Sequence, residues 1–304
     1  MPTLERLAAS PHRVVAAVSQ PDRPRGRGRQ QSPSPVAAAA ERAAIPALRT
    51  EQVGETGFVA QLRATAPDLG IVVAFGQFLP RRVRELPRAG YLINAHASLL
   101  PRHRGAAPIA HAILAGDRET GVSVMRVERE MDAGPVAVVR RTPIGAEETA
   151  GELEDRLAAL AADAIAEAVD QIAWERVHWT PQDAAQATLA PKLRVEDALL
   201  DWSEAAGALA RRVRALAPRP GAFTYLAGER LRILRATALP GAVGEPPGTV
   251  RLGGPAPLRV ACGSDWLVPR ILQRAGGNPI DAESFQRGRG IPDGARLGSL
   301  EAGG

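Results

Sequence analysis

Residues 91–108 read YLINAHASLLPRHRGAAP, and this stretch decides the fold class. Its beginning, Tyr91 to Ala95, is typical of a buried strand, and Ala106 to Ala115 is typical of a helix. Outward from it, short apolar runs alternate with helical patterns. The predicted strands are 14–19, 69–75, 121–127 and 136–140, and the predicted helices are 3–9, 35–44, 58–66 and 149–173. This alternation predicts an α/β domain with a parallel sheet covered on both faces.

The second half of the chain has a different pattern. Residues 180–193 are polar, aperiodic and interrupted by proline, which is typical of a linker. One helix is predicted over 204–216. Five short strands separated by Gly and Pro follow, at 223–226, 231–235, 249–252, 258–261 and 267–272. Five such strands indicate a small barrel.

The overall composition is that of a globular protein, with 304 residues of which 45% are hydrophobic and 23% charged. The longest apolar run, 69–75, is far shorter than the roughly 20 residues that a membrane helix needs. The N-terminus lacks the apolar core of a signal peptide. Cys262 is the only cysteine, so an internal disulfide is excluded. We therefore expect a soluble protein of the cytoplasm.

The positive charge is concentrated towards the C-terminus. Residues 1–178 hold 22 basic and 21 acidic residues, whereas residues 179–304 hold 16 and 12. Nearly all the basic residues are arginine, with Lys192 the only lysine. Clustered arginine suits a polyanionic partner, although charge alone does not decide between such a partner and an ordinary basic surface.

The residues best suited to chemistry lie where the strand of the quoted stretch ends. Ligands bind at this end of the strands in open α/β sheets. Asn94 and His96 are two residues apart, so their side chains share one face if the strand continues through them. An amide that stabilises an oxyanion beside an imidazole that handles a proton suits acyl transfer. A buried histidine satisfied by backbone groups explains His96 equally well at this stage.

A carboxylate follows 36 residues later. Asp132 lies in a glycine-containing turn between two predicted strands, where it could orient the imidazole and favour its protonated form. Aspartate in such a turn is also a common turn former, and the spacing alone leaves both interpretations open. His12, His111 and His178 have no partners at metal-ligand spacing, so we predict no metal site.

These motifs together resemble a known family. The run Asn94-x-His96-x-Ser98-Leu99-Leu100-Pro101, its continuation Arg104-Gly105-Ala106-Ala107-Pro108-Ile109 and the turn Asp132-Ala133-Gly134 are similar to the 10-formyltetrahydrofolate-dependent formyltransferases. Segments 20–36, 190–193, 200–202 and 219–224 resemble the members that act on initiator tRNA. The resemblance therefore covers nearly the whole chain.

The resemblance implies a Rossmann-like catalytic domain over 1–178, a linker over 179–195 and an OB-like barrel over 196–304 that helps to hold tRNA. The implied reaction moves a formyl group from N10 of the folate to the α-amino group of methionine on initiator tRNA, for translation initiation. Asn94 and protonated His96 would stabilise the tetrahedral oxyanion, and Asp132 would hold His96.

The resemblance also implies the ligand contacts. The folate co-substrate is expected along Ser98, Leu99, Leu100 and Pro101, with His103 at the rim, and no metal is implied. The tRNA is expected to contact Lys192 and a basic loop that contains Arg23, Arg25, Arg27 and Arg29. Because Pro and Gly alternate with these arginines, we predict that they lie off any regular helix, on a mobile loop. The resemblance implies that Arg27 is its main contact. The implied protein is a cytoplasmic monomer without a membrane partner.

The start of the chain departs from the family pattern. Members normally begin with a strand and a turn before the first helix, whereas this chain starts inside that helix. We expect that about a dozen residues are missing, through a misassigned start or a genuine truncation that removes a central strand. Two alternatives stay open: a formyltransferase acting on a sugar nucleotide or purine intermediate, and an inactive tRNA-binding or folate-binding protein.

Overall fold

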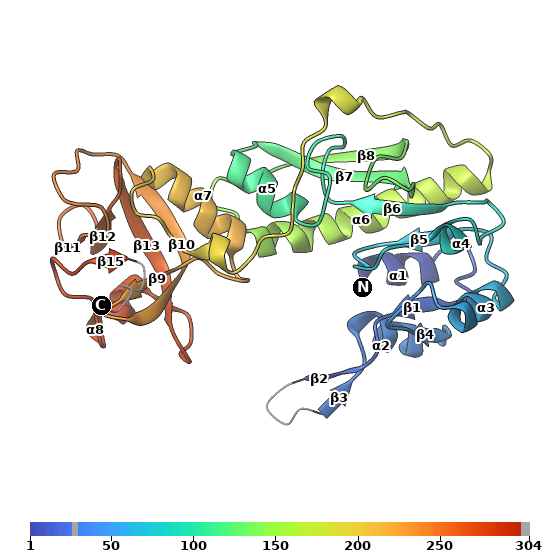
Figure 1. The fold of residues 1–304 in the computed structure, drawn as a ribbon, viewed down its shortest axis with the longest axis horizontal. Coiled ribbons are helices and arrows are strands. Elements are labelled where there is room, and N and C mark those ends of the chain that lie inside the picture. The colour runs from blue at the N-terminus through green and yellow to red at the C-terminus, as the bar shows by residue number, and fades with distance from the viewer. Residues whose placement is uncertain (26–29, 299–304) are drawn as a thin grey trace. The chain divides into compact units, whose positions relative to one another are not determined.

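The computed structural model describes residues 1–25 and 30–298, apart from the side chains of Arg25 and Gln30. It has two compact units that are interleaved along the chain (Figure 1). Unit 1 contains Met1–Ala106, Thr120–Thr142 and Asp155–Ala190, and unit 2 contains Ala107–Glu119, Pro143–Glu154 and Pro191–Gly304. The boundaries 1–178, 179–195 and 196–304 stay predictions.

The sheet that positions the site lies in unit 1. Its strands follow the order β5 (Gly70–Val72), β6 (Leu92–His96), β7 (Glu119–Arg126) and β8 (Val136–Pro143). Strands β5 and β6 are parallel, as predicted. Strand β7, however, pairs with β6 in the antiparallel direction. Its central residues are buried throughout, and such an apolar run reports burial on both faces but not strand direction.

A second parallel pair lies in the same unit. It is formed by β1 (Ala17–Ser19) and β4 (Ala47–Arg49). Among the described residues, β1 and β5 each have a single strand partner. The helices of this region are α1 (Pro2–Ala8), α2 (Pro35–Arg42), α3 (Thr56–Ala64) and α4 (Arg81–Arg84). Helix α2 begins as predicted, because the Oγ of Ser34 accepts a hydrogen bond from the Ala37 amide at 3.1 Å.

The arginine-bearing segment forms a hairpin that the sequence did not predict. Strands β2 (Arg23–Arg25) and β3 (Gln30–Ser32) pair antiparallel, and the hairpin projects from unit 1 (Figure 1). Arg23 and Arg25 lie off any helix, as predicted, but backbone pairing places them in a strand pair rather than a loop, although these residues have weak strand propensity. Arg27 and Arg29 lie outside the described residues.

The long helix α6 (Ala150–Ala173) starts at a reciprocal cap. The Thr149 amide donates to Glu152 Oε2 at 2.9 Å, and the Glu152 amide donates to Thr149 Oγ1 at 3.4 Å. This is a capping box, which satisfies amides that the first helical turn leaves without partners. An ion pair between Arg140 and Glu167 joins the helix to β8.

Unit 2 is dominated by a curled antiparallel sheet. Its path is β11 (Val250–Leu252), β12 (Leu258–Ala261), β13 (Trp266–Arg274), β10 (Glu229–Leu239), β9 (Phe223–Leu226) and β15 (Leu297–Gly298), with β14 (Ile280–Asp281) beside β13. A bridge between Thr249 and Arg296 brings the two ends of this path together. All five predicted strands are confirmed, and the curled sheet agrees with the predicted barrel-like domain.

Unit 2 also contains helices, one of which packs against the sheet. They are α5 (Pro108–Ala115), α7 (Ala206–Leu216) and α8 (Ala282–Arg287), with short 3-10 turns at Ala184–Gln186 in unit 1 and Glu196–Ala198 in unit 2. Leu209 and Val213 of α7 and Ile233 of β10 are completely buried in one apolar core. The indole N–H of Trp202 donates to Thr224 Oγ1 at 3.0 Å, which joins two of the segments behind the resemblance.

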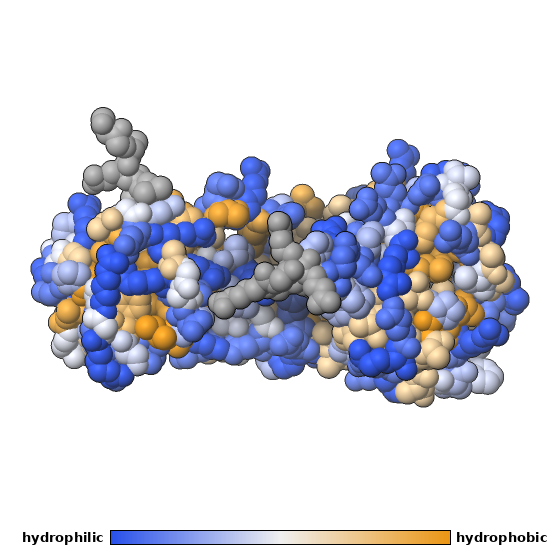
Figure 2. All heavy atoms as spheres, turned by 90° about the horizontal axis from the view of Figure 1, so that it is seen from below, coloured by the Kyte–Doolittle hydropathy of each residue, from blue (hydrophilic) through white to orange (hydrophobic). Residues whose placement is uncertain are grey.

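One face of the molecule shows mixed hydrophilic and hydrophobic side chains. On the face shown in Figure 2, hydrophobic side chains form small groups scattered among hydrophilic ones. None of the helices in the described part of the chain is long and apolar enough to cross a membrane.

Candidate active site

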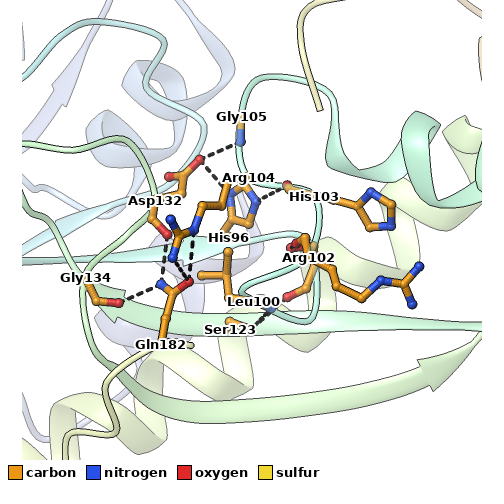
Figure 3. A network of polar contacts seen from close by, with 11 residues as sticks. His96, Leu100, Arg102, His103, Arg104, Gly105, Ser123, Asp132, Gly134 and Gln182 are labelled. Carbon is orange, nitrogen blue, oxygen red and sulfur yellow. Dashed lines mark hydrogen bonds and ion pairs between the residues drawn. The ribbon is translucent and has the colours of Figure 1, made fainter. Parts of the chain in front are cut away.

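His96 is the buried centre of the site in unit 1. It is the last residue of β6 and is 6% exposed. Its Nε2 lies 2.8 Å from the backbone oxygen of His103, and its Nδ1 lies 3.5 Å from Asp132 Oδ2 (Figure 3). Since a carbonyl only accepts hydrogen bonds, Nε2 is the donor to His103, while Nδ1 faces the Asp132 carboxylate.

The turn that carries Asp132 returns its carboxylate to the end of β6. Asp132 has a φ of +53°, an uncommon left-handed conformation that aspartate tolerates better than most residues. Its Oδ2 accepts a hydrogen bond from the Gly105 amide at 2.9 Å. Gly105 itself has a φ of +126°, and a Cβ there would approach the Ala190 oxygen to 2.6 Å. Glycine is therefore required at position 105, where the loop that follows β6 contacts Asp132.

Asn94 lies two residues before His96 on the same strand and is half-buried. It stands opposite Val72 of β5 and Met125 of β7 in the sheet register. Strand alternation places Asn94 and His96 on one face, as predicted. The structure therefore brings an amide, an imidazole and a carboxylate to one region of unit 1.

The expected folate loop, Ser98 to Pro101, is bound tightly to the protein through its own polar groups. Ser98 is completely buried, and its Oγ donates to the Arg102 oxygen at 2.6 Å. The Oγ of Ser123 on β7 donates to the Ser98 oxygen at 2.8 Å and accepts from the Leu100 amide at 3.1 Å. Ser123 is thus a support of this loop that the sequence reasoning did not single out.

Two further polar residues of the site were missed. Arg104 is 8% exposed, and its Nε and Nη2 donate to Gln182 Oε1 at 3.1 and 2.8 Å. Gln182 Nε2 in turn donates to the backbone oxygens of Asp132 and Gly134 (Figure 3). Arg104 lies within the quoted motif, which is a signal that it belongs to the site. Gln182 lies in the polar linker pattern, where the sequence offers no such signal.

A surface hollow lies at the turn that carries Asp132. A hollow of about 580 Å³ is lined by Glu128, Arg129, Glu130 and Ala133 of the turn that carries Asp132. Phe78, in the segment that follows β5, is 76% exposed. Because β5 and β6 are parallel, their carboxyl ends lie at the same edge of the sheet.

Within residues 1–25 and 30–298, no group of three His, Cys, Asp or Glu side chains is placed to hold a metal ion.

Of the residues expected to contact tRNA, Arg23 and Lys192 are described with their side chains. Arg23 is exposed on the hairpin of unit 1, and Lys192 is exposed at the start of the last segment of unit 2. On β10, the guanidinium of Arg230 lies 3.7 Å from the ring centroid of Phe223. Burial, and then the charges of Arg230 and Arg219, lower the pKa of Arg232 from its ordinary value. This marks a concentration of positive charge in unit 2.

Comparison with known proteins gives the class of this protein. The sequence matches the formyl transferase family over residues 3–169 and the formyl transferase C-terminal domain over residues 192–290. The chain belongs to the formyl transferase family and is a formyltransferase enzyme.

Its relatives are more specific. The chain is 46% identical over 303 residues to a methionyl-tRNA formyltransferase of Chromohalobacter salexigens, covering 97% of this chain and 93% of the relative. It is 40% identical over 301 residues to a methionyl-tRNA formyltransferase of Citrifermentans bemidjiense, covering 99% and 94%.

Solved structures share the fold at low identity. A methionyl-tRNA formyltransferase from Clostridium thermocellum matches with a TM-score of 0.51 and 16% identity over 64% of this chain and 82% of its own. HypX from Aquifex aeolicus in complex with tetrahydrofolic acid matches with a TM-score of 0.60 and 20% identity, covering 84% of this chain but only 45% of HypX. WlaRD, a sugar 3N-formyl transferase, matches with a TM-score of 0.66 and 12% identity, covering 91% and 94%.

Proposed function

We propose that this protein transfers the formyl group of 10-formyltetrahydrofolate to the α-amino group of methionyl initiator tRNA, and that it acts in the cytoplasm. The observation that carries the proposal is the contact of His96 with Asp132 beside Asn94. It occurs in a chain that is 40–46% identical to methionyl-tRNA formyltransferases over nearly its full length.

The reaction begins when the neutral amine of methionine attacks the formyl carbon. The carbonyl oxygen of the formyl group becomes an oxyanion, which the Asn94 amide and the positive charge of the His96 ring stabilise. The bond between the formyl carbon and N10 then breaks. The amine loses a proton to water and N10 gains one, so that tetrahydrofolate leaves. Asp132 keeps the His96 ring oriented.

The folate fits the edge of the sheet at the carboxyl ends of β5 and β6. The loop Ser98 to Pro101 offers a wall that its internal hydrogen bonds keep in place. The exposed ring of Phe78 provides an apolar face, which is the kind of surface that covers a flat heterocycle. Contacts of the loop residues with the folate remain part of this proposal.

The tRNA is held by positive charge outside the catalytic centre. Arg23, Arg25, Arg27 and Arg29 of the basic segment, together with Lys192, would contact its phosphates. The arginines around Arg232 would add sequence-independent contacts of the same kind. Such contacts position the acceptor end without reading bases.

The experiment is a comparison of acceptors. Formylation by this chain with 10-formyltetrahydrofolate is measured on methionyl initiator tRNA, methionyl elongator tRNA and a nucleotide-linked amino sugar. We expect efficient formylation of the initiator alone. Formylation of the sugar in preference to both tRNAs would contradict the proposal, as would tight binding of initiator tRNA without any turnover by a folded protein.

A further inference from the structure

The side chain of Gln182 lies between two parts of the catalytic centre. Its Nε2 donates to the Asp132 oxygen at 2.8 Å and to the Gly134 oxygen at 2.7 Å. Its Oε1 accepts two hydrogen bonds from Arg104, at 3.1 and 2.8 Å. A glutamine amide offers two donor hydrogens and two acceptor lone pairs. All four are used here, two on each side (Figure 3).

The hydrogen bonds from Gln182 hold the backbone of the turn that orients the Asp132 carboxylate. Asp132 holds an uncommon left-handed conformation, so its backbone depends on surrounding contacts to keep it there. Gln182 binds the carbonyl of Asp132 and that of the residue two positions later. If these bonds are lost, the carboxylate can shift from its 2.9 Å contact with the Gly105 amide and its 3.5 Å contact with His96.

The segment that carries Gln182 is itself fixed at both ends. On one side, the backbones of Thr180 and Val136 exchange two hydrogen bonds of 2.9 Å. The neighbouring Trp179 stacks edge-on against Tyr91, with ring centroids 5.6 Å apart. Residues 179–190, which we call the strap, are therefore attached to the sheet next to the turn that carries Asp132.

On the other side, the strap is attached to the loop after β6 that contains His103 and Arg104. The Arg104 amide donates to the Thr188 oxygen at 2.8 Å, and the Ala190 amide donates to the Arg104 oxygen at 2.7 Å. The His103 amide donates to Thr188 Oγ1 at 2.8 Å, next to the carbonyl that accepts from His96. The strap thus contacts both the loop that binds Nε2 of His96 and the turn that binds Nδ1.

We infer that Gln182 is a positioning residue for formyl transfer, which holds the backbone of the Asp132 turn so that the carboxylate faces His96. In this role Gln182 acts through Asp132. The inference rests on the proposed function, in which His96 and Asp132 carry the reaction.

The test uses the nearly isosteric substitution Gln182→Glu. A glutamate still accepts hydrogen bonds from Arg104, but its carboxylate has no hydrogen to donate to the two carbonyls. We expect kcat to fall about 10- to 100-fold, since small misplacements of catalytic groups have effects of this size. The KM values for folate and tRNA should change less than about twofold, and the NMR signal of the His96 ring should shift.

Two other variants separate positioning from general stability. Gln182→Met removes both donors while keeping an unbranched side chain of similar length, so it should lower kcat in the same way. Gln186→Glu lies in the same strap, where the Gln186 side chain donates to Asp183 Oδ2, and should leave kcat and the His96 signal unchanged. A wild-type kcat for Gln182→Glu and Gln182→Met, or a loss confined to KM, would overturn the inference.

The NMR measurement keeps this inference distinct from the proposed function. If wild-type protein fails to formylate methionyl-tRNA, the proposed function is wrong. The His96 signal of the Gln182 variants, assigned with His96→Ala, then decides alone whether Gln182 positions the ring. An unshifted signal in both variants overturns the inference.

Discussion

The catalytic centre and the arginine cluster on β10 both bury charged groups in part, but they arrange them in opposite ways. At the centre, His96 faces Asp132, and Nη1 of Arg104 lies 3.7 Å from Glu130, so unlike charges meet. In the cluster, Arg232 lies near Arg230 and Arg219. Burial lowers the pKa of Arg232 most, and the like charges of these two arginines lower it further. In the proposed function, the first arrangement orients groups for chemistry. The second leaves positive charge that the phosphates of a bound nucleic acid can neutralise.

Removing the imidazole of His96 should have the largest effect, and it tests whether catalysis and tRNA binding depend on different regions. We expect His96→Ala to lower kcat by about 1,000-fold or more, because both charge stabilisation and orientation are lost. The Kd for initiator tRNA, measured by filter binding, should stay near the wild-type value. An equal loss of turnover and tRNA binding would contradict the separation of the two regions.

Removing an arginine that is expected to contact tRNA should have a smaller effect, and it should change tRNA binding rather than kcat. Arg27→Ala and Arg219→Ala are each expected to raise the KM for tRNA several-fold and to reduce the slope of log K against log salt by about 1. The value of kcat should hardly change. Arg81→Ala, which removes an equal charge from an exposed pair with Glu85, is the control. If both variants keep the wild-type kcat/KM, these arginines do not contact the tRNA.

A substitution at the start of α6 should affect stability alone. Thr149→Ala removes the cap and is expected to lower the free energy of unfolding by about 1 kcal/mol at pH 7. The hydrogen bond from the Thr149 amide is the main reason why the pKa of Glu152 lies below its ordinary value. The charged Glu152 therefore stabilises the fold above that value, and this contribution is lost as the pH falls through the lowered pKa. Urea unfolding at pH 7 and pH 3 measures both effects. Thr149→Ala keeps this amide but removes the hydroxyl that donates to Glu152 Oε2 at 2.8 Å, so its effect should be smaller at pH 3 than at pH 7. An equal effect at the two pH values would contradict a contribution from this bond.

The smallest effect is expected at Cys262. This thiol is buried in unit 2, and burial raises its pKa to about 11. Since only the thiolate reacts readily, a disulfide reagent at pH 8 should leave the native protein unmodified and label it after unfolding. Rapid labelling of the native protein would show that the core of unit 2 opens easily.

Local patterns predicted most of the fold. Residues 223–226 and 258–261 form strands with the predicted bounds, because β-branched and apolar residues lie there between Gly and Pro. The pairing direction of β7 was not predictable, since burial on both faces gives the same apolar run in either direction. The pairing of β2 with β3 was missed because these strands depend on backbone pairing rather than on apolar side chains.

The candidate site was predictable only where its residues lie within a recognisable motif. Asn94, His96 and Asp132 were singled out, and the structure brings His96 and Asp132 into contact. Gln182 was not, because it meets Asp132 from 50 residues away in sequence, through a contact that only the folded chain creates. Polar residues in an aperiodic segment have the same pattern whether they are solvated or bound to a catalytic turn.

The most direct test of the account is a side-by-side measurement of kcat and tRNA Kd for Asp132→Asn. The amide oxygen of asparagine can still accept the hydrogen bond from Gly105, so the variant removes chiefly the charge that faces His96. The account predicts that kcat falls about 100-fold or more while the Kd for initiator tRNA stays within about twofold. A wild-type kcat in a folded Asp132→Asn protein would contradict the assignment of the His96–Asp132 pair to the chemistry.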